Sequence, residues 1–216
     1  MDPPVTEAGT AREDFCRFLA ACYYEPGPEF GEERLFDSLR ETAARVDPGL
    51  GAGAHRLGEA FRALDLERLL VDYTRLFLGP VGAPARPYGA LWLGTDQTLM
   101  QDSTMDVLAL YREGGFDLAD DFREAPDHIA AELEFLYLLL FRERGARRDG
   151  NVTALAEVER LRRRLLGEHL GRWAGPFTRA LHAGAQTAYY RELADLTARF
   201  VELEARRAVA PAGSSA

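Results

Sequence analysis

Lysine is absent from this sequence of 216 residues. All 26 basic residues are therefore arginine, so the chain has no lysine for a phosphate-binding P-loop, a Schiff base or general-base catalysis. Cysteine is also scarce. Cys16 and Cys22 lie on one predicted helix at a spacing typical of neither a zinc knuckle nor a redox pair. We interpret both as small apolar core residues of a protein in a reducing compartment.

The sequence is also poor in serine, in long apolar runs and in positive charge. It has four serines, two of them in the tail, and none lies in a Gly-x-Ser-x-Gly elbow, which excludes a hydrolase of that type. No stretch approaches the roughly 18 uninterrupted apolar residues of a membrane span, and the N-terminus lacks the basic and apolar regions of a secretory signal. We therefore expect a cytoplasmic protein without stable membrane insertion. The net charge of −9 argues against nucleic-acid binding and favours a basic partner.

What the sequence does contain is apolar residues at helical spacing along most of its length. Because no segment alternates like a strand between hairpin turns, we predict an all-α fold, a single-domain bundle of about eight to ten helices. The domain is expected at residues 10–208, between a flexible N-terminus (1–9) and a disordered tail (209–216). Thr10 and Glu13 have capping-box spacing, and Asp65 is an expected internal cap or bend. The predicted helices cover 10–25, 29–45, 55–78, 103–113, 126–144, 151–168, 173–182 and 187–207.

Two glycine-rich segments interrupt the helical pattern. Residues 49–54 superficially resemble a dinucleotide-binding loop, but they follow a predicted helix and lack the third glycine of that motif, so we interpret them as a linker. Residues 79–92 contain three prolines and three glycines, which predicts an ordered loop about 12 residues long and suggests a function. Its apolar residues and those of its shoulders either form a groove for a peptide or cover the core. These residues are Leu76, Phe77, Pro87, Tyr88, Leu91 and Trp92.

Pro126, Asp127 and His128 precede a strongly apolar stretch. Proline at the first helical position and aspartate in the first turn make a well-formed helix start. A histidine at the positive end of a helix is less expected, because protonation is disfavoured there and a neutral imidazole is left free to hydrogen-bond. The residues alone leave two interpretations open, a helix cap and a binding site.

His128 and Glu132 lie one helical turn apart and could share a metal ion. Two ligands do not make a site, and His55, His169 and His182 lie on other predicted elements. We therefore predict no metal site, no catalytic residue and no cofactor.

Five segments occur in order between Phe15 and Phe200, and together they are more specific than any one alone. They are Tyr73–Pro80, Pro87–Tyr88, Leu110–Phe116, Glu124–Leu136 and His169–Phe177. This set resembles the TorD/DmsD family of chaperones, also called redox enzyme maturation proteins, which are cytosolic maturation factors for molybdoenzymes.

The resemblance implies a TorD-like helical domain that binds the twin-arginine signal peptide and the apoprotein of a molybdopterin-dependent oxidoreductase. Such chaperones hold the precursor for cofactor insertion before export. A twin-arginine peptide has a basic head and an apolar middle, which an acidic rim and an aromatic groove complement. We expect Asp127 to pair with an arginine and His128 to hydrogen-bond the peptide backbone. The implied peptide-binding surface consists of Leu76, Phe77, Pro87, Tyr88, Trp92, Pro126, Asp127 and His128.

Two alternatives remain open from the sequence. A NarJ-like assembly factor for a molybdoenzyme subunit that is never exported uses the same helical fold. A helical metal-dependent hydrolase centred on His128 belongs to a different class and requires a bound metal. The sequence does not distinguish a monomer from a dimer that exchanges helices.

Overall fold

The structure, a computed structural model, describes residues 7–28, 35–79, 82–94, 102–119 and 122–209. Within these ranges the chain is helical and contains no strand, which confirms the all-α prediction. No helix among them is both long and apolar enough to cross a membrane. The helices are α1 (Glu7–Ala21), α3 (Leu35–Val46), α4 (Pro48–Arg62), α5 (Leu66–Tyr73), the π-helical turn η1 (Thr74–Leu78), α6 (Ala90–Leu93), α7 (Asp102–Glu113), α8 (Ile129–Arg148), α9 (Val152–Glu168), α10 (Leu170–Gly184) and α11 (Ala188–Val209).

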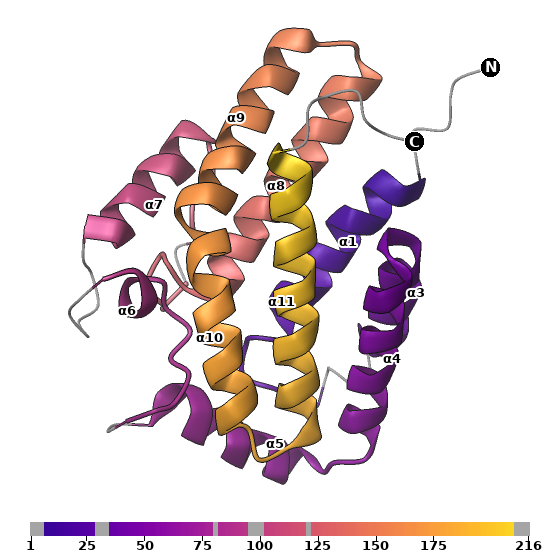
Figure 1. Cartoon of the computed structure of the whole chain (residues 1–216), viewed down its shortest axis with the longest axis vertical. Helices are drawn as coiled ribbons and strands as arrows, with labels where there is room; N and C mark the ends of the chain where they lie inside the picture. The colour runs from indigo at the N-terminus through magenta and orange to yellow at the C-terminus, as the bar shows by residue number, and fades with distance from the viewer. Residues whose placement is uncertain (1–6, 29–34, 80–81, 95–101, 120–121, 210–216) are drawn as a thin grey trace.

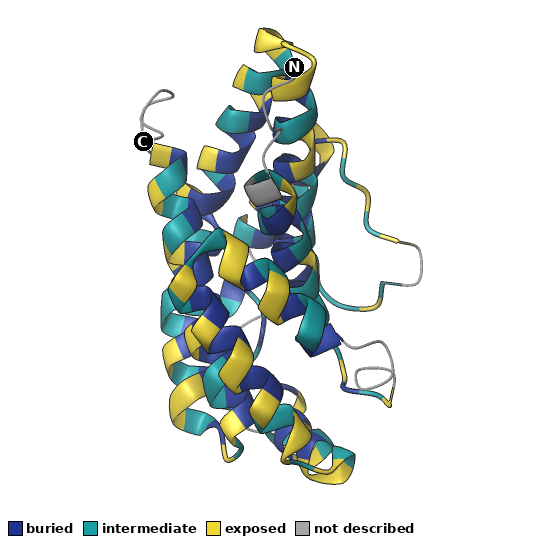
Figure 2. Ribbon diagram, turned by 90° about the vertical axis from the view of Figure 1, so that its right-hand side faces the viewer, coloured by how far each residue is buried: buried dark blue, intermediate teal, exposed yellow. Residues whose placement is uncertain are grey.

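The long helices run roughly along one axis of the molecule (Figure 1). α9 and α10 follow one another beside α11, while α1 packs on α8 and α3 packs on α4. α5 lies across one end of the bundle, and α6 and α7 lie on the side opposite α3 and α4. Buried and exposed residues alternate along each long helix, as the amphipathic pattern predicts (Figure 2).

Aromatic side chains fill the part of the core that supports α5 and η1. The ring of Phe77 lies 6.3 Å from that of Tyr23, in the turn after α1, and 5.5 Å from that of Tyr190 on α11. Leu76 is fully buried beside it. Burying each such side chain contributes about 1.5–3 kcal/mol, so η1 is held firmly from beneath.

The N-terminal helix differs from its prediction. α1 begins at Glu7, three residues before Thr10, and Glu13 does not close a capping box. Its carboxylate instead accepts two hydrogen bonds from Arg144 of α8, at 2.7 and 3.0 Å. A bidentate arginine pair between helices is a stronger use of that carboxylate than a cap. Residues 1–6 of the predicted flexible N-terminus, and 210–216 of the predicted tail, lie outside the described residues.

The linker prediction for residues 49–54 is wrong, because they lie within α4. The Asp47 side chain caps this helix by accepting hydrogen bonds from the Gly49 and Leu50 amides, at 2.9 and 3.0 Å. A Cβ at Gly51 would lie 2.9 Å from Ala44 of α3, and a Cβ at Gly53 would lie 2.9 Å from Leu196 of α11. Glycine costs about 1 kcal/mol in a helix, but here its size allows close packing on both sides.

Asp65 is confirmed as an internal cap, since its side chain accepts a hydrogen bond of 2.8 Å from the Arg68 amide where α5 begins. The predicted helix 55–78 is therefore two α-helices followed by a π-helical turn. The predicted helix 29–45 is confirmed from Leu35 onward, and residues 29–34 lie outside the described ranges.

Candidate functional site

Two segments distant in sequence meet where the loop after η1 reaches the start of α8. The Ile129 amide donates a hydrogen bond of 2.9 Å to the Pro87 carbonyl, and the Gly89 amide donates one of 2.8 Å to the Asp127 carbonyl. Tyr88 and His128 therefore form an isolated antiparallel bridge. We call residues 87–90 and 126–129 the corner.

Asp127 joins three elements at the corner from within. Its Oδ2 accepts a hydrogen bond of 2.6 Å from the Ala90 amide at the start of α6 and one of 3.3 Å from the Thr104 hydroxyl of α7. Its Oδ1 is buried without a hydrogen-bond partner among the described residues. The residue is only 2% exposed, so the expected pairing with a peptide arginine is not available in this conformation.

His128 is the N-cap of α8, and its Nδ1 accepts a hydrogen bond of 3.2 Å from the Ala130 amide. The expectation that Pro126 occupies the first helical position is therefore wrong, because the helix begins at Ile129. Burial lowers the pKa of His128 to about 4, although nearby Glu124 opposes the shift. The imidazole is thus neutral at pH 7, as a hydrogen-bond acceptor at a helix start must be.

Aromatic rings enclose His128. Tyr24 stacks on the imidazole at a centroid distance of 6.3 Å, and Tyr88 meets it edge-on at 5.4 Å. The Tyr88 hydroxyl donates to Glu124, and the Tyr111 hydroxyl donates a 2.9 Å hydrogen bond to the Pro126 carbonyl. The imidazole of His128 is buried, so in this conformation it is not accessible for the expected hydrogen bond to a peptide backbone.

Beneath the corner lies a buried carboxyl that the sequence did not single out in this role. Glu132 Oε1 accepts a hydrogen bond of 3.0 Å from the Trp173 indole of α10, and its Oε2 has no partner among the described residues. Burial raises the pKa of Glu132 well above 4.5, and the nearby charge of Asp127 raises it further. A Cβ at Gly89 would lie 3.0 Å from the Trp173 nitrogen, so glycine lets the loop approach this pair without displacing the indole.

The other predicted site residues divide into two groups. Leu76 and Phe77 belong to the core, and Pro87 is buried within the corner. Tyr88, Trp92 and Pro126 are half-buried and form its rim. The Trp92 indole donates a 3.0 Å hydrogen bond to the Arg86 carbonyl, which fixes the ring on the loop.

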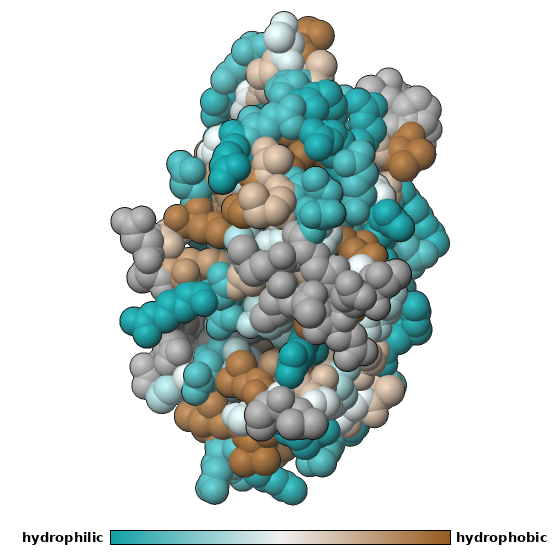
Figure 3. All heavy atoms as spheres, turned by 90° about the vertical axis from the view of Figure 1, so that its left-hand side faces the viewer, coloured by the Kyte–Doolittle hydropathy of each residue, from teal (hydrophilic) through white to brown (hydrophobic). Residues whose placement is uncertain are grey.

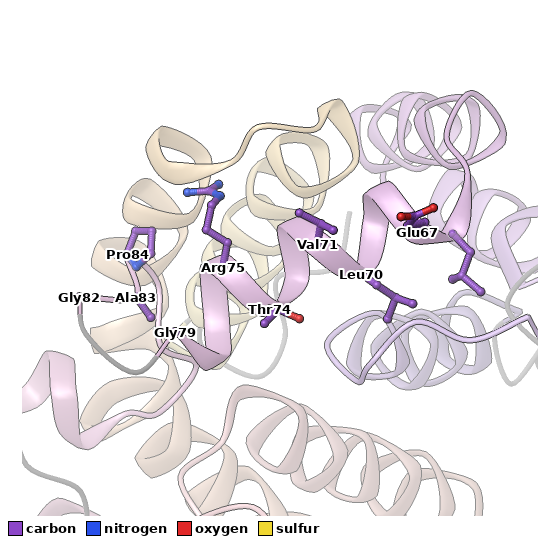
Figure 4. Close-up of a pocket in the computed structure, with 10 residues that line it drawn as sticks. Glu67, Leu70, Val71, Thr74, Arg75, Gly79, Gly82, Ala83 and Pro84 are labelled. Atoms are coloured by element: carbon purple, nitrogen blue, oxygen red, sulfur yellow. The ribbon is translucent and has the colours of Figure 1, made fainter.

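An open apolar groove lies on the part of the chain that precedes the corner, and no motif in the sequence indicated it. It lies between α5 with η1 on one side and Gly79 with residues 82–84 on the other, with a volume of about 880 Å³ (Figure 4). Hydrophobic surface gathers toward this end of the molecule (Figure 3). The residues described along it are Leu66, Glu67, Leu70, Val71, Thr74, Arg75, Gly79, Gly82, Ala83 and Pro84. Aliphatic residues on an exposed helix face form no sequence motif. The one sequence feature that could have indicated the groove is Val71, an apolar residue on the polar side of a helix.

Across the described ranges, no three His, Cys, Asp or Glu side chains come together to hold a metal ion. His128 and Glu132 do not form the metal pair that their spacing allowed, because the His128 Nδ1 caps α8 and Glu132 binds Trp173.

Comparison with known proteins identifies the family. Residues 43–179 match the family described as nitrate reductase delta subunit. The chain belongs to this family. Over 189 residues, 86% of each chain, it is 29% identical to the Tat proofreading chaperone DmsD of Salmonella typhimurium. Alignments with some other relatives span 62% of their lengths.

A second relative is more similar over a shorter stretch. The chain is 37% identical to the selenate reductase assembly chaperone protein of Thauera selenatis over 91 residues, which cover 42% of this chain and 44% of that protein. The names of these relatives are those of chaperones. The resemblance to the TorD/DmsD chaperones is confirmed, and the names of these relatives describe assembly chaperones rather than enzymes.

The fold is also that of a solved structure. A crystal structure described as that of a candidate redox enzyme maturation protein from Archaeoglobus fulgidus aligns with a TM-score of 0.59 at 18% identity. The alignment covers 88% of this chain and 93% of that one. At this identity the likeness concerns the fold alone, and it confirms the TorD-like prediction.

Proposed function

We propose that this chain is a cytoplasmic chaperone that binds the twin-arginine signal peptide and the apoprotein of a molybdopterin-dependent oxidoreductase until its cofactor is inserted. The observation that carries the proposal is the match over 86% of the chain to a Tat proofreading chaperone. The relative named for selenate reductase assembly supports a redox enzyme as the client.

In this proposal the rim of the corner contacts the signal peptide. Tyr88, Trp92 and Pro126 are partly exposed and supply aromatic and proline surface of the kind that binds extended peptides. Asp127 and His128 position that rim through their hydrogen bonds to the amides of Ala90 and Ala130. Pro87, Leu76 and Phe77 support it from inside.

Titration calorimetry with synthetic signal peptides of the twin-arginine molybdoenzyme precursors from the same genome tests the proposal. We expect one peptide to bind, and Trp92→Ala to weaken its affinity about tenfold or more, since a buried aromatic anchor contributes about 2 kcal/mol at an interface. Phe141→Ala is the matched control, because Phe141 is an aromatic residue of α8 that is 48% exposed and lies more than three turns from the corner. The proposal fails if no peptide binds.

A second function is favoured by the family description itself, since a nitrate reductase delta subunit matches over residues 43–179. In a NarJ-like assembly factor, the client is a subunit that carries no export signal. The two functions differ in a single measurement. Equal affinity for an apoprotein with and without its signal peptide favours the assembly factor, whereas loss of binding on removal of the peptide favours the export chaperone.

A further inference from the structure

The groove beside α5 exposes apolar side chains that a stable core would cover. Val71, which lines the groove near the middle of the segment formed by α5 and η1, is 58% exposed, and Leu78 at the end of that segment is 49% exposed. Leu70 and Thr74 line the groove beside Val71 (Figure 4). Contiguous apolar surface in a chain with a net charge of −9 marks an interaction site more often than a solvated face.

Charge is distributed unevenly along the groove. Arg75 does not present a free cation, because its guanidinium donates a 2.6 Å hydrogen bond to Asp72 and another hydrogen bond to the Gly184 carbonyl. Glu67 lies at the other end of the groove (Figure 4) and has no ion-pair partner among the described residues. The groove is thus apolar along its length and acidic at the Glu67 end.

The walls of the groove are built to keep their shape. The Ala85 amide donates a 3.1 Å hydrogen bond to the Leu76 carbonyl, which ties the loop to η1. Pro84 packs so closely on α10 that a Cβ at Gly184 would lie 2.9 Å from it. η1 itself is a π-helical turn, a local distortion that is often found at functional sites. A preformed groove loses little conformational entropy on binding.

The last helix of the described chain leads away from the groove. α5 lies beside the start of α11, where Asp72 accepts hydrogen bonds from the amides of Gln186 and Thr187. α11 has 22 residues and is therefore about 33 Å long, so Val209 lies far from α5.

We propose that this groove binds the apolar segment of the twin-arginine signal peptide, with the basic segment of the peptide at the Glu67 end. The inference rests on the proposed function and adds where the peptide binds and in which direction it lies in the groove. A basic head followed by an apolar run is complementary to an apolar groove whose one unpaired charge among the described lining residues is acidic and terminal. A second copy of this acidic chain lacks that complementarity.

Calorimetry with the signal peptide that binds wild-type protein tests whether the groove is the binding site. Val71→Glu places a charge in the groove and is expected to weaken binding at least tenfold. Val152→Glu is the matched control, because Val152 on α9 is an equally sized side chain that is 77% exposed, and its affinity should stay within about twofold of wild type. Because both positions are exposed, thermal unfolding should show that both variants fold.

The direction of the bound peptide along the groove is tested separately, by charge reversal and by crosslinking. Glu67→Arg is expected to weaken binding several-fold, whereas Asp117→Arg, at an exposed position outside the groove, should not. A benzophenone amino acid at Glu67 should crosslink to residues next to the two arginines, and the same group at Val71 should crosslink to the apolar segment.

The outcomes separate the two proposals. If no signal peptide binds wild-type protein, the proposed function fails. If a peptide binds and Val71→Glu has no effect, the function stands and the groove inference is overturned. It is also overturned if light scattering shows a dimer that Val71→Glu dissociates while peptide binding is unchanged, because the groove then binds a second copy.

Discussion

The corner and the groove lie on adjoining parts of the chain, yet they use their side chains in opposite ways. At the corner, Asp127 and His128 are each 2% exposed and bind backbone amides of their own fold. In the groove, Val71 is 58% exposed and lines an open apolar surface. The residues that draw attention in the sequence thus hold the scaffold, and ordinary aliphatic residues form the open surface.

The sharpest test of this contrast is the pH dependence of stability at the corner. Burial lowers the pKa of His128 from 6.5 to about 4. Between these values the unfolded chain binds a proton that the folded chain does not. Stability is therefore fully present above pH 6.5 and falls as the pH drops, by about 3 kcal/mol at pH 4. Urea unfolding at a series of pH values between 4 and 7 measures the loss.

His128→Asn is the control for this prediction, because asparagine keeps an oxygen that caps a helix but does not titrate. The substitution should remove the contribution of His128 to the pH dependence of the free energy of unfolding. The contribution of the buried His169 should remain, because burial lowers its pKa as well. The same pH slope in both proteins would contradict the assignment.

A smaller effect with the opposite sign is expected at Glu132. Its folded-state pKa is raised by burial, so Glu132 lowers stability increasingly as the pH rises above its unfolded value of 4.5. Glu132→Gln keeps an acceptor for Trp173 and removes the charge. We expect it to raise the free energy of unfolding at pH 8 by about 1 kcal/mol or more, with little change near pH 4. A variant that is less stable than wild type at pH 8 argues that the carboxylate is stabilised there.

The smallest effect is expected in the groove. Val71→Ser removes apolar surface from an exposed position, so the free energy of unfolding should change by no more than about 0.5 kcal/mol. Urea unfolding at pH 7 provides the measurement. A loss well above that value would assign Val71 to the core and remove the contrast between the two regions.

Periodicity was sufficient to predict most of the fold. Helices such as α7 and α9 end close to their predicted bounds, because their apolar stripes, caps and glycine stops agree with one another. The linker prediction for residues 49–54 was wrong because glycine lowers the local helix propensity. What favours glycine there is the close approach of Ala44 and Leu196, a tertiary contact that the local sequence does not reveal.

The site was predicted only in part, for a related reason. The sequence singled out two distant segments, and the structure does join them through the bridge between Tyr88 and His128. The sequence does not reveal that Asp127 faces inward onto Ala90 and Thr104. The solvent exposure of a residue at a helix start depends on which loop covers it, and that is a property of the folded chain. The groove carries no motif, because an exposed valine becomes informative only beside the loop at residues 82–84.

The π-helical turn η1 sets a limit on how this surface can diversify. Removing Thr74 or Arg75 would restore an α-helical turn and rotate the residues after it by about 100°. Such a rotation would carry Leu76 and Phe77 away from the core and turn the residues now facing solvent toward it. The segment can therefore exchange side chains to suit a different client, but it cannot change its length.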